Sequence, residues 1–426
     1  MKTSKNNLLK QATGGFVTKI FAALLGFGLS VIFARMLGPE GFGIYSVALS
    51  ISNLLAMALT LGLPVLVVRQ VAIYKSNKQW SLLQGLLLIS YQWPLKAMIA
   101  IGILALPLYY ILPGNYSNTM FFILALSILI AVNQIRAAAM RGLNWVVLAD
   151  VPELILKPVV MIAMIAISAL IGLSANNASW AMSIQVSATL CTFALGAWIL
   201  KRRLPIEIST VTVEYDNKKW LFAGISFFAV AIISAIEGQI SLLMLGGIAG
   251  AKEAGIFQAA FQLVSPLIFG LLAVNMALQT KLAAAWEGKN IEYSQQIVSE
   301  AARLGFVVAL IVAIPLIVFA DEFLSLFGNS YIEATMALKI IVFGQLVNAA
   351  AGSCGVLLSM TGNQREVLLG MVLALIINSS LCFLLIPTWG VDGAAVGTAV
   401  GLVTWNVYMA SKAKRITGIK TYLTFK

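Results

Sequence analysis

The chain has 426 residues, of which 60% are hydrophobic and only 10% are charged. Soluble domains are about 45–50% apolar and about 25% charged, so this composition excludes a soluble protein and predicts one with many membrane spans. Histidine is absent and the three cysteines lie within apolar runs, so neither a metal site nor a disulfide framework is expected. The net charge of +12 is not a nucleic-acid signal, because the topology described below accounts for most of it.

Charged and turn residues divide the chain into about twelve apolar segments, each long enough to cross a bilayer as a helix. The first two are joined by LGPEGFG (37–43), whose proline and glycines favour a turn. The predicted spans are 12–35, 42–68, 84–112, 119–139, 151–173, 178–200, 220–246, 254–278, 302–324, 335–359, 367–387 and 391–411. No loop is long enough for a soluble domain. The sequence therefore predicts an all-α polytopic membrane protein.

Lysine and arginine are distributed unevenly between the two predicted sides of the membrane. The connections from odd to even spans contain few of them, whereas both ends of the chain and the even-to-odd connections hold most of the 28. Basic residues accumulate on the cytoplasmic side of membrane proteins. We therefore expect a multi-pass protein with cytoplasmic N- and C-termini.

An internal repeat is indicated on either side of the longest polar connection, KRRLPIEISTVTVEYDNKK (201–219). MLGPEGFGIYSVA (36–48) is echoed by MLGGIAGAKEAGIFQAA (244–260): Met-Leu-Gly aligns at an offset of 208, and Gly-Ile-(Tyr/Phe) at 212. Offsets near half of the chain length favour a duplicated six-helix unit. The predicted domains are an N-terminal bundle (1–205), a cytoplasmic linker (206–219) and a C-terminal bundle (220–426), with pseudo-symmetry between the bundles.

The segment KQATGGFVTKIFAALLGFGLSVIFARMLGPEGFGIYSVALSI (10–51), followed by LGLPVLVVRQVA (61–72), resembles the polysaccharide-type flippases of the multidrug/oligosaccharidyl-lipid/polysaccharide export superfamily. LGPEGFGIYS is the most family-specific piece. The resemblance implies two six-helix bundles around a central cavity, working by alternating access in the bacterial inner membrane. It also implies the cargo, an undecaprenyl-pyrophosphate-linked oligosaccharide that moves from the cytoplasmic to the periplasmic leaflet for surface polysaccharide synthesis. Polysaccharide polymerase and glycosyltransferases are the further partners that it implies.

A path for a lipid-linked pyrophosphate needs cations that face water. Charge inside a span is costly and by default marks a pathway. Lys19 lies about 10 Å into the first predicted span, at about 1.5 Å per residue, and Lys96 lies near the middle of the third. These two lysines are the leading substrate contacts. The alternative for each is a cation that snorkels to interfacial water or donates to backbone carbonyls.

Further cations are weaker candidates for the same lumen: Lys157, Arg69, Arg136, Arg141 and Arg35. Glu153 precedes Lys157 by four residues, the favourable order for a local helical ion pair, so Lys157 is either a lumen cation or a structural partner. Arg69, Arg136 and Arg141 are expected at cytoplasmic helix ends, where topology and head-group contact also explain them. Arg35 is expected at the periplasmic exit, with the same ambiguity.

Glu237 is the one acid predicted deep inside a span, flanked by Ser234, Gln239 and Ser241. Burial favours the protonated form of a carboxylate, and such a group can carry a proton or bind Na⁺. Glu237 is therefore a candidate site for a coupling ion, H⁺ or Na⁺, and the alternative is an interhelical hydrogen bond. No cofactor is expected.

Two other functional classes remain to be weighed. A drug extruder of the same superfamily would favour acidic residues in its lumen, whereas the in-span charges here are mostly lysines. A membrane-bound glycan polymerase or ligase commonly has a large periplasmic loop with catalytic charges, and the outer loops here are short. The chain has no Walker A pattern GxxxxGK[ST]. We therefore expect a transporter and not an enzyme.

Overall fold

The structure, a computed structural model, describes residues 2–111, 114–172, 177–205 and 207–423. Within these ranges, the side chains of residues 2–20, 103–111, 114–118, 209–210, 217–219, 221–223, 225–227, 229–230 and 280 are not described.

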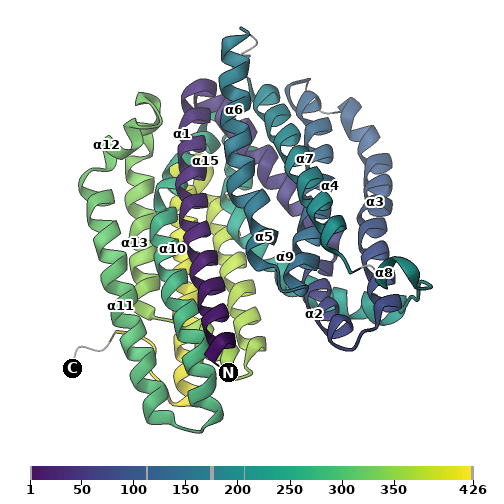
Figure 1. Cartoon of the computed structure of the whole chain (residues 1–426). Coiled ribbons are helices and arrows are strands. Elements are labelled where there is room, and N and C mark those ends of the chain that lie inside the picture. Colours follow the sequence, from purple (N-terminus) through teal and green to yellow (C-terminus); the bar gives the residue numbers. More distant parts are fainter. Residues whose placement is uncertain (1, 112–113, 173–176, 206, 424–426) are drawn as a thin grey trace. The chain divides into compact units, whose positions relative to one another are not determined.

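The first half of the chain forms α1 (Lys2–Thr60), α2 (Leu63–Ser76), α3 (Trp80–Ile111), α4 (Gly114–Gly142), α5 (Val146–Val151), the π-helical turn η1 (Pro152–Leu156), α6 (Lys157–Leu170), α7 (Ala178–Arg203) and α8 (Glu207–Thr210). The second half forms α9 (Asn217–Ile248), α10 (Ala251–Glu287), α11 (Ile291–Val318), α12 (Ala320–Ser325), the 3₁₀ turn η2 (Asn329–Ala334), α13 (Thr335–Ala351), α14 (Cys354–Met360) and α15 (Gln364–Thr417). Figure 1 labels most of these elements.

The fold class predicted from the sequence is confirmed. The described residues contain no strand, and nine of their helices are long and apolar enough to cross a membrane. Two of the nine are divided by a glycine with non-helical backbone angles: α1 at Gly38 (φ 66°, ψ 176°) and α15 at Gly390 (φ 51°, ψ −121°). Gly38 lies in the predicted LGPEGFG turn, and Gly390 lies between the last two predicted spans. The protein is an all-α polytopic membrane protein.

The chain divides into two compact units. Unit 1 comprises Met1–Leu29 and Ala48–Ile232, and unit 2 comprises Ser30–Val47 and Ile233–Lys426. The short segment Ser30–Val47 therefore packs with the second half of the chain, although its flanks pack with the first half. The bundles predicted at 1–205 and 220–426 were inferred from the sequence repeat and not from contacts. They stay a prediction.

The polar linker between the predicted bundles is docked onto unit 1. The backbone N–H of Glu214 donates to the carbonyl of Ser81 at 3.3 Å. Gly85 of α3 makes this approach possible, because a Cβ atom there would lie 1.9 Å from the carbonyl oxygen of Glu214. Just beyond the linker, the indole of buried Trp220 donates to the hydroxyl of Tyr74 at 3.0 Å. These contacts explain why unit 1 continues past the linker to Ile232.

The LGPEGFG turn is held in unit 2 by two reciprocal glycine contacts. A Cβ atom at Gly43 would lie 1.7 Å from the carbonyl oxygen of Ala251, and one at Gly255 would lie 2.0 Å from that of Pro39. Pro39 and Ala251, like Gly43 and Gly255, are 212 residues apart, which is the offset of the Gly-Ile-(Tyr/Phe) repeat. The two copies of the motif therefore contact each other through equivalent backbone positions.

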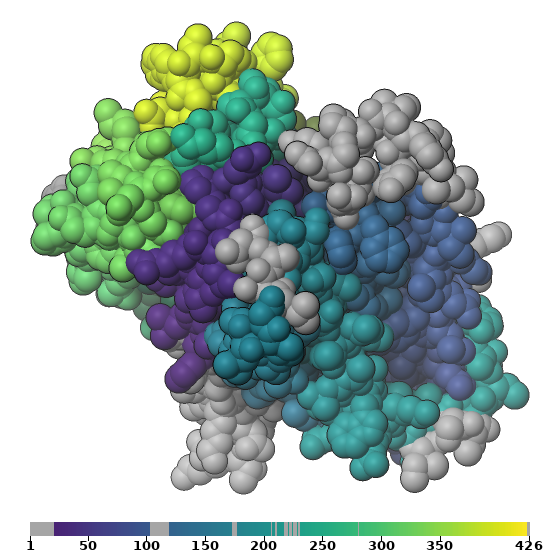
Figure 2. Space-filling view, turned by 90° about the horizontal axis from the view of Figure 1, so that it is seen from above, coloured from purple at the N-terminus to yellow at the C-terminus, as the bar shows by residue number. Residues whose placement is uncertain are grey.

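Further contacts fix the same segment against unit 2. The hydroxyl of Tyr331 in η2 donates to the carbonyl of Ala34 at 3.0 Å, and Arg35 Nε donates to the carbonyl of Leu326 at 2.7 Å. The rings of Phe42 and Tyr331 form an edge-to-face pair with centroids 6.3 Å apart. Figure 2 colours the first helix purple and the second half of the chain green to yellow. Hydrogen bonds and aromatic packing thus reinforce the glycine contacts.

Replacing either repeat glycine with alanine should destabilise the protein. The added methyl group of Gly43→Ala or Gly255→Ala would meet backbone atoms rather than a movable side chain, so a helix must shift. Overpacking of this kind costs about 1–3 kcal/mol, and we expect a lower melting temperature in detergent. Gly247→Ala is the matched control, because a Cβ there has no neighbour within 4 Å. Equal melting temperatures for Gly43→Ala and Gly247→Ala would contradict this account of the contact.

Candidate functional site

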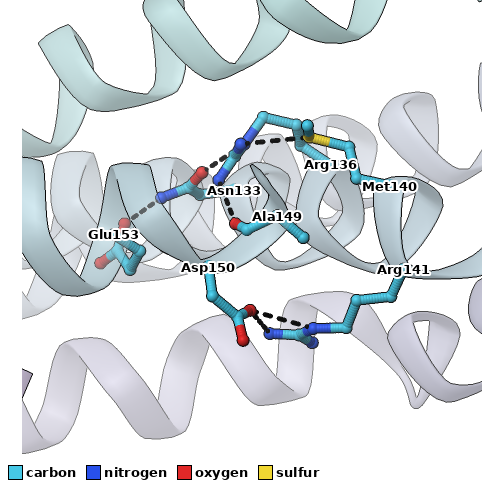
Figure 3. A network of polar contacts seen from close by, with 7 residues as sticks. All are labelled: Asn133, Arg136, Met140, Arg141, Ala149, Asp150 and Glu153. Atoms are coloured by element: carbon cyan, nitrogen blue, oxygen red, sulfur yellow. Dashed lines mark hydrogen bonds and ion pairs between the residues drawn. The ribbon is translucent and has the colours of Figure 1, made fainter. Parts of the chain in front are cut away.

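Charged side chains gather in unit 1 where α4 is followed by α5, η1 and α6 (Figure 3). The chain reverses at Asn144, whose φ of 68° is a left-handed conformation that asparagine tolerates. Pro152 then opens η1, and Pro158 follows it, so two backbone donors are missing from this part of the helix. The N–H of Lys157 donates to the carbonyl of Pro152, five residues back, as in a π turn. This local chemistry places Glu153 beside α4.

A chain of hydrogen bonds connects four side chains of this region. Lys157 Nζ is 2.6 Å from one carboxylate oxygen of Glu153. The other oxygen accepts from the side-chain amide of Asn133, whose own oxygen accepts from Arg136 Nε at 2.8 Å. These four side chains, hereafter the Lys157–Arg136 network, contain two cations and one anion. The network therefore carries one more positive than negative charge.

Arg136 has no exposed surface, and its burial depends on a glycine. Its guanidinium donates to Met140 Sδ at 3.5 Å and to the carbonyl of Ala149 at 3.3 Å, besides Asn133. A Cβ atom at Gly196 of α7 would lie 2.2 Å from Arg136 Nη1. A buried charge is tolerated when it is paired and hydrogen-bonded, and Gly196 supplies the space for that arrangement.

A second ion pair lies beside this chain, at the end of α4 (Figure 3). Arg141 Nη2 and Nε donate to the same Asp150 oxygen at 2.6 and 3.1 Å. Because the Arg141 side chain is 45% exposed, this pair contributes little to stability, as exposed ion pairs typically do. The pair orients Arg141 without removing it from the surface.

The other predicted cations of unit 1 have different surroundings. Lys96 lies at the middle of α3, is exposed, and has no hydrogen bond or ion pair with the side chains that the structure describes. Arg69 is an exposed residue of α2. The side chain of Lys19 lies outside the described residues, so its prediction stays untested.

Two expectations about the cations can be compared directly with the structure. The i,i+4 ion pair of Glu153 and Lys157 is confirmed. Head-group contact does not explain Arg136, because the residue is fully buried. Its expected place at the cytoplasmic end of a helix stays a prediction. Asp150 and Gly196 were not predicted as parts of the site. No spacing or motif in the sequence indicates that Asp150 contacts Arg141 or that Gly196 contacts Arg136.

Unit 2 contains the remaining candidates. Arg35 is exposed and donates to Leu326, and Glu237 is a partly buried residue of α9. One turn after Glu237, Ser241 donates to Asn378 Oδ1 at 3.2 Å and accepts from Thr398 at 2.8 Å. Glu237 itself forms no hydrogen bond or ion pair with described residues. The interhelical hydrogen bonds in this part of α9 are therefore made by Ser241 and not by Glu237, for which such a bond is the predicted alternative role.

Unit 2 also contains a small cavity of about 30 Å³ between α10, α11 and α13. Its polar lining comes from Asn275, Asn348 and Ser353, and its other walls are aliphatic side chains and glycine. Ser353 donates to Asn275 Oδ1 at 2.5 Å. None of the lining residues is charged.

Long apolar helices that carry a few paired or isolated charges define the class of this protein as a multi-pass membrane protein. The chain belongs to the family described as Polysaccharide biosynthesis protein, which it matches over residues 8–280. Residues 226–384 also match the MatE family. The predicted resemblance is confirmed, and the protein is a transporter rather than an enzyme.

Two curated relatives span nearly the whole chain. The chain is 23% identical over 417 residues to a Shigella flexneri protein named for O-antigen transport, covering 95% of this chain and 96% of that protein. It is 22% identical over 445 residues to stage V sporulation protein B of Bacillus subtilis (strain 168), covering 95% and 82%.

Solved transporter structures share the fold. An inward-facing multidrug resistance MATE family transporter matches with a TM-score of 0.75 and 15% identity, over 91% of this chain and 94% of that one. A Pyrococcus furiosus transporter of the MOP superfamily, described as having a binding pocket of reverse polarity, matches with a TM-score of 0.67 and 17% identity, over 96% of each chain. At these identities the likeness establishes the fold alone.

The dependence of Arg136 on Gly196 can be measured with a double-mutant cycle. Gly196→Ala should destabilise the protein, because its methyl group would occupy the position of the guanidinium. Arg136→Gln removes the atoms that clash, so Gly196→Ala should cost less in that background. We expect a coupling free energy of about 0.5–3 kcal/mol from chemical unfolding in detergent. Additive effects of the two substitutions would show that the side chains do not compete for this space.

Proposed function

We propose that the protein flips an undecaprenyl-pyrophosphate-linked oligosaccharide from the cytoplasmic to the periplasmic leaflet of the bacterial inner membrane. The transport serves surface polysaccharide synthesis and proceeds by alternating access. The family match and the relative named for O-antigen transport support the choice of cargo. In this proposal both termini are cytoplasmic, and the polysaccharide polymerase and the glycosyltransferases are the partners that use and supply the lipid-linked glycan.

The single observation that carries the proposal is the exposure of Lys96, which has no partner among the described side chains. Lys96 lies near the middle of α3, within the predicted span 84–112. A lysine at the centre of a membrane helix costs about 2.5–3.5 kcal/mol on insertion scales, and such residues face a cavity or pair with another group. Lys96 is exposed and pairs with no side chain that the structure describes. An aqueous path for an anionic head group accounts for such a residue, and a lipid-facing surface does not.

The other cations take different roles along the proposed path. Lys19 is the second contact for the pyrophosphate, while Arg69 and Arg141 attract the head group at the cytoplasmic mouth and Arg35 does so at the periplasmic exit. Arg136 has no exposed surface, so it adds positive potential without touching the cargo. Lys157 is available only when it leaves Glu153. Membrane lipid surrounds the polyprenyl tail throughout.

Glu237 is the proposed site for the coupling ion, H⁺ or Na⁺. It lies in the apolar part of α9, and no described residue neutralises its carboxylate. A carboxylate in such a position can exchange a cation as the carrier changes state. The flippase would then act as an antiporter, with the ion gradient as its energy source.

A second candidate function is ion-coupled extrusion of a drug or other small molecule. The match of residues 226–384 to the MatE family favours it. Two observations in unit 1 argue against drug extrusion. Lys96 is unpaired among the described residues, and the Lys157–Arg136 network has one excess positive charge. These cations disfavour a cationic drug and favour an anionic cargo.

Reconstituted flipping of a fluorescent polyprenyl-pyrophosphate oligosaccharide tests the proposal. Wild type should flip the lipid, and Lys96→Ala should reduce the rate about 10- to 100-fold, because hydrogen bonds to charged groups contribute about 1.5–3 kcal/mol. Lys96→Arg should retain most of the activity. Lys78→Ala, at an exposed lysine of the α2–α3 turn, is the control. A wild-type protein that moves no lipid but exports a cationic dye would favour the drug extruder.

A further inference from the structure

The ion pair of Glu153 and Lys157 has two unequal partners. Glu153 accepts from Lys157 with one oxygen and from Asn133 with the other, and Asn133 is held in turn by Arg136. Lys157, in contrast, has Glu153 as its one side-chain partner among the described residues. If the lysine moves away, the carboxylate keeps its second donor and a nearby buried cation. Glu153 is therefore the fixed partner and Lys157 the mobile one.

The pair is also within reach of a ligand. The Lys157 side chain is 15% exposed and that of Glu153 is 33% exposed, whereas Arg136 is completely covered. A lysine ammonium is a compact charge on a flexible stem with rotatable donors, so it can change partners with little rearrangement. An anion that approaches this surface can therefore compete with Glu153 for Lys157.

Competition of this kind would set the strength of cargo binding. An anion that binds Lys157 must displace a carboxylate that already lies 2.6 Å away. Transport requires a site that binds strongly enough to load and weakly enough to release. A fixed internal carboxylate meets both demands, because it lowers the affinity for the anion and reclaims the lysine when the anion leaves.

We propose that Glu153 is a tethered competitor of the cargo's pyrophosphate for Lys157, and so a positioning residue that limits affinity and speeds release. This inference rests on the proposed function. Lys157 binds the pyrophosphate in the loaded carrier, while Glu153 stays in place on Asn133. On unloading, Lys157 returns to Glu153.

The test compares the kinetics of flipping for substitutions at both positions. Glu153→Gln should lower the apparent KM for the lipid-linked oligosaccharide about 10-fold and also lower the maximal rate. Lys157→Gln should raise the KM. The double variant Glu153→Gln/Lys157→Gln should behave like Lys157→Gln, because without the lysine the carboxylate of Glu153 competes with the cargo for no cation. A merely structural ion pair would make both single variants lose activity in the same direction. An unchanged KM in folded Glu153→Gln would overturn the inference.

Glu333→Gln is the matched control, since it makes the same chemical change in the exposed ion pair of Lys252 and Glu333, where the atoms are 3.2 Å apart. It should leave both kinetic constants unchanged. If Glu153→Gln does not fold, Glu153→Asp provides the test, because it keeps the charge but retracts it by one methylene. That variant should shift the KM in the same direction to a smaller extent.

A binding measurement separates failure of this inference from failure of the proposed function. Inorganic pyrophosphate should raise the melting temperature of the purified wild type. Half of the shift should be reached at a lower concentration in Glu153→Gln and at a higher concentration in Lys157→Gln, which keeps Lys96 and Lys19. If that pattern appears but no lipid is flipped, the anion site stands and the proposed cargo is wrong. If lipid is flipped and the variants bind pyrophosphate as wild type does, the proposed function stands and the tethered competitor is wrong.

Discussion

The close backbone contact between Gly43 and Gly255, the equivalent glycines of the two repeat copies, is the constraint on which the rest of unit 2 depends. Gly43 and Gly255 each lie so close to the backbone of the other copy that neither can carry a side chain without moving a helix. Backbone atoms cannot move aside as side chains can, so the contact fixes the LGPEGFG turn against the start of α10. The hydrogen bonds of Ala34 and Arg35 then add to a position that the glycines have already determined.

Charge inside an apolar protein is the second constraint, and unit 1 meets it in two ways. Arg136 is fully buried, held by Asn133 and accommodated by Gly196, so its guanidinium is fixed in place and out of reach of a ligand. Lys96 is exposed with no described side-chain partner, and Lys157 is partly exposed and paired. Unit 1 therefore holds one positive charge that is fixed and covered and two that a ligand can reach, an arrangement that suits the proposed anionic cargo.

Local chemistry made much of the fold predictable from the sequence, because span length, turn residues and i,i+4 spacing act over short distances. The turn at Gly38 and the Glu153–Lys157 pair belong to this group. Contacts between distant residues could not be predicted. The repeat offset of 212 aligned Gly43 with Gly255 but did not show that they touch, and nothing connected Gly196 with Arg136. The burial of Arg136 was missed because its position near a helix end suggested the membrane surface.

Thiol labelling at position 96 tests the central claim, that an in-span cation of unit 1 faces an aqueous path for an anionic lipid. Lys96→Cys would be placed in a background that lacks the three native cysteines, Cys191, Cys354 and Cys382. The account predicts labelling by a membrane-impermeant maleimide in proteoliposomes, and slower labelling when a polyprenyl-pyrophosphate oligosaccharide is present. Labelling by a lipid-soluble maleimide alone, with no protection by the oligosaccharide lipid, would contradict it and place Lys96 against the bilayer.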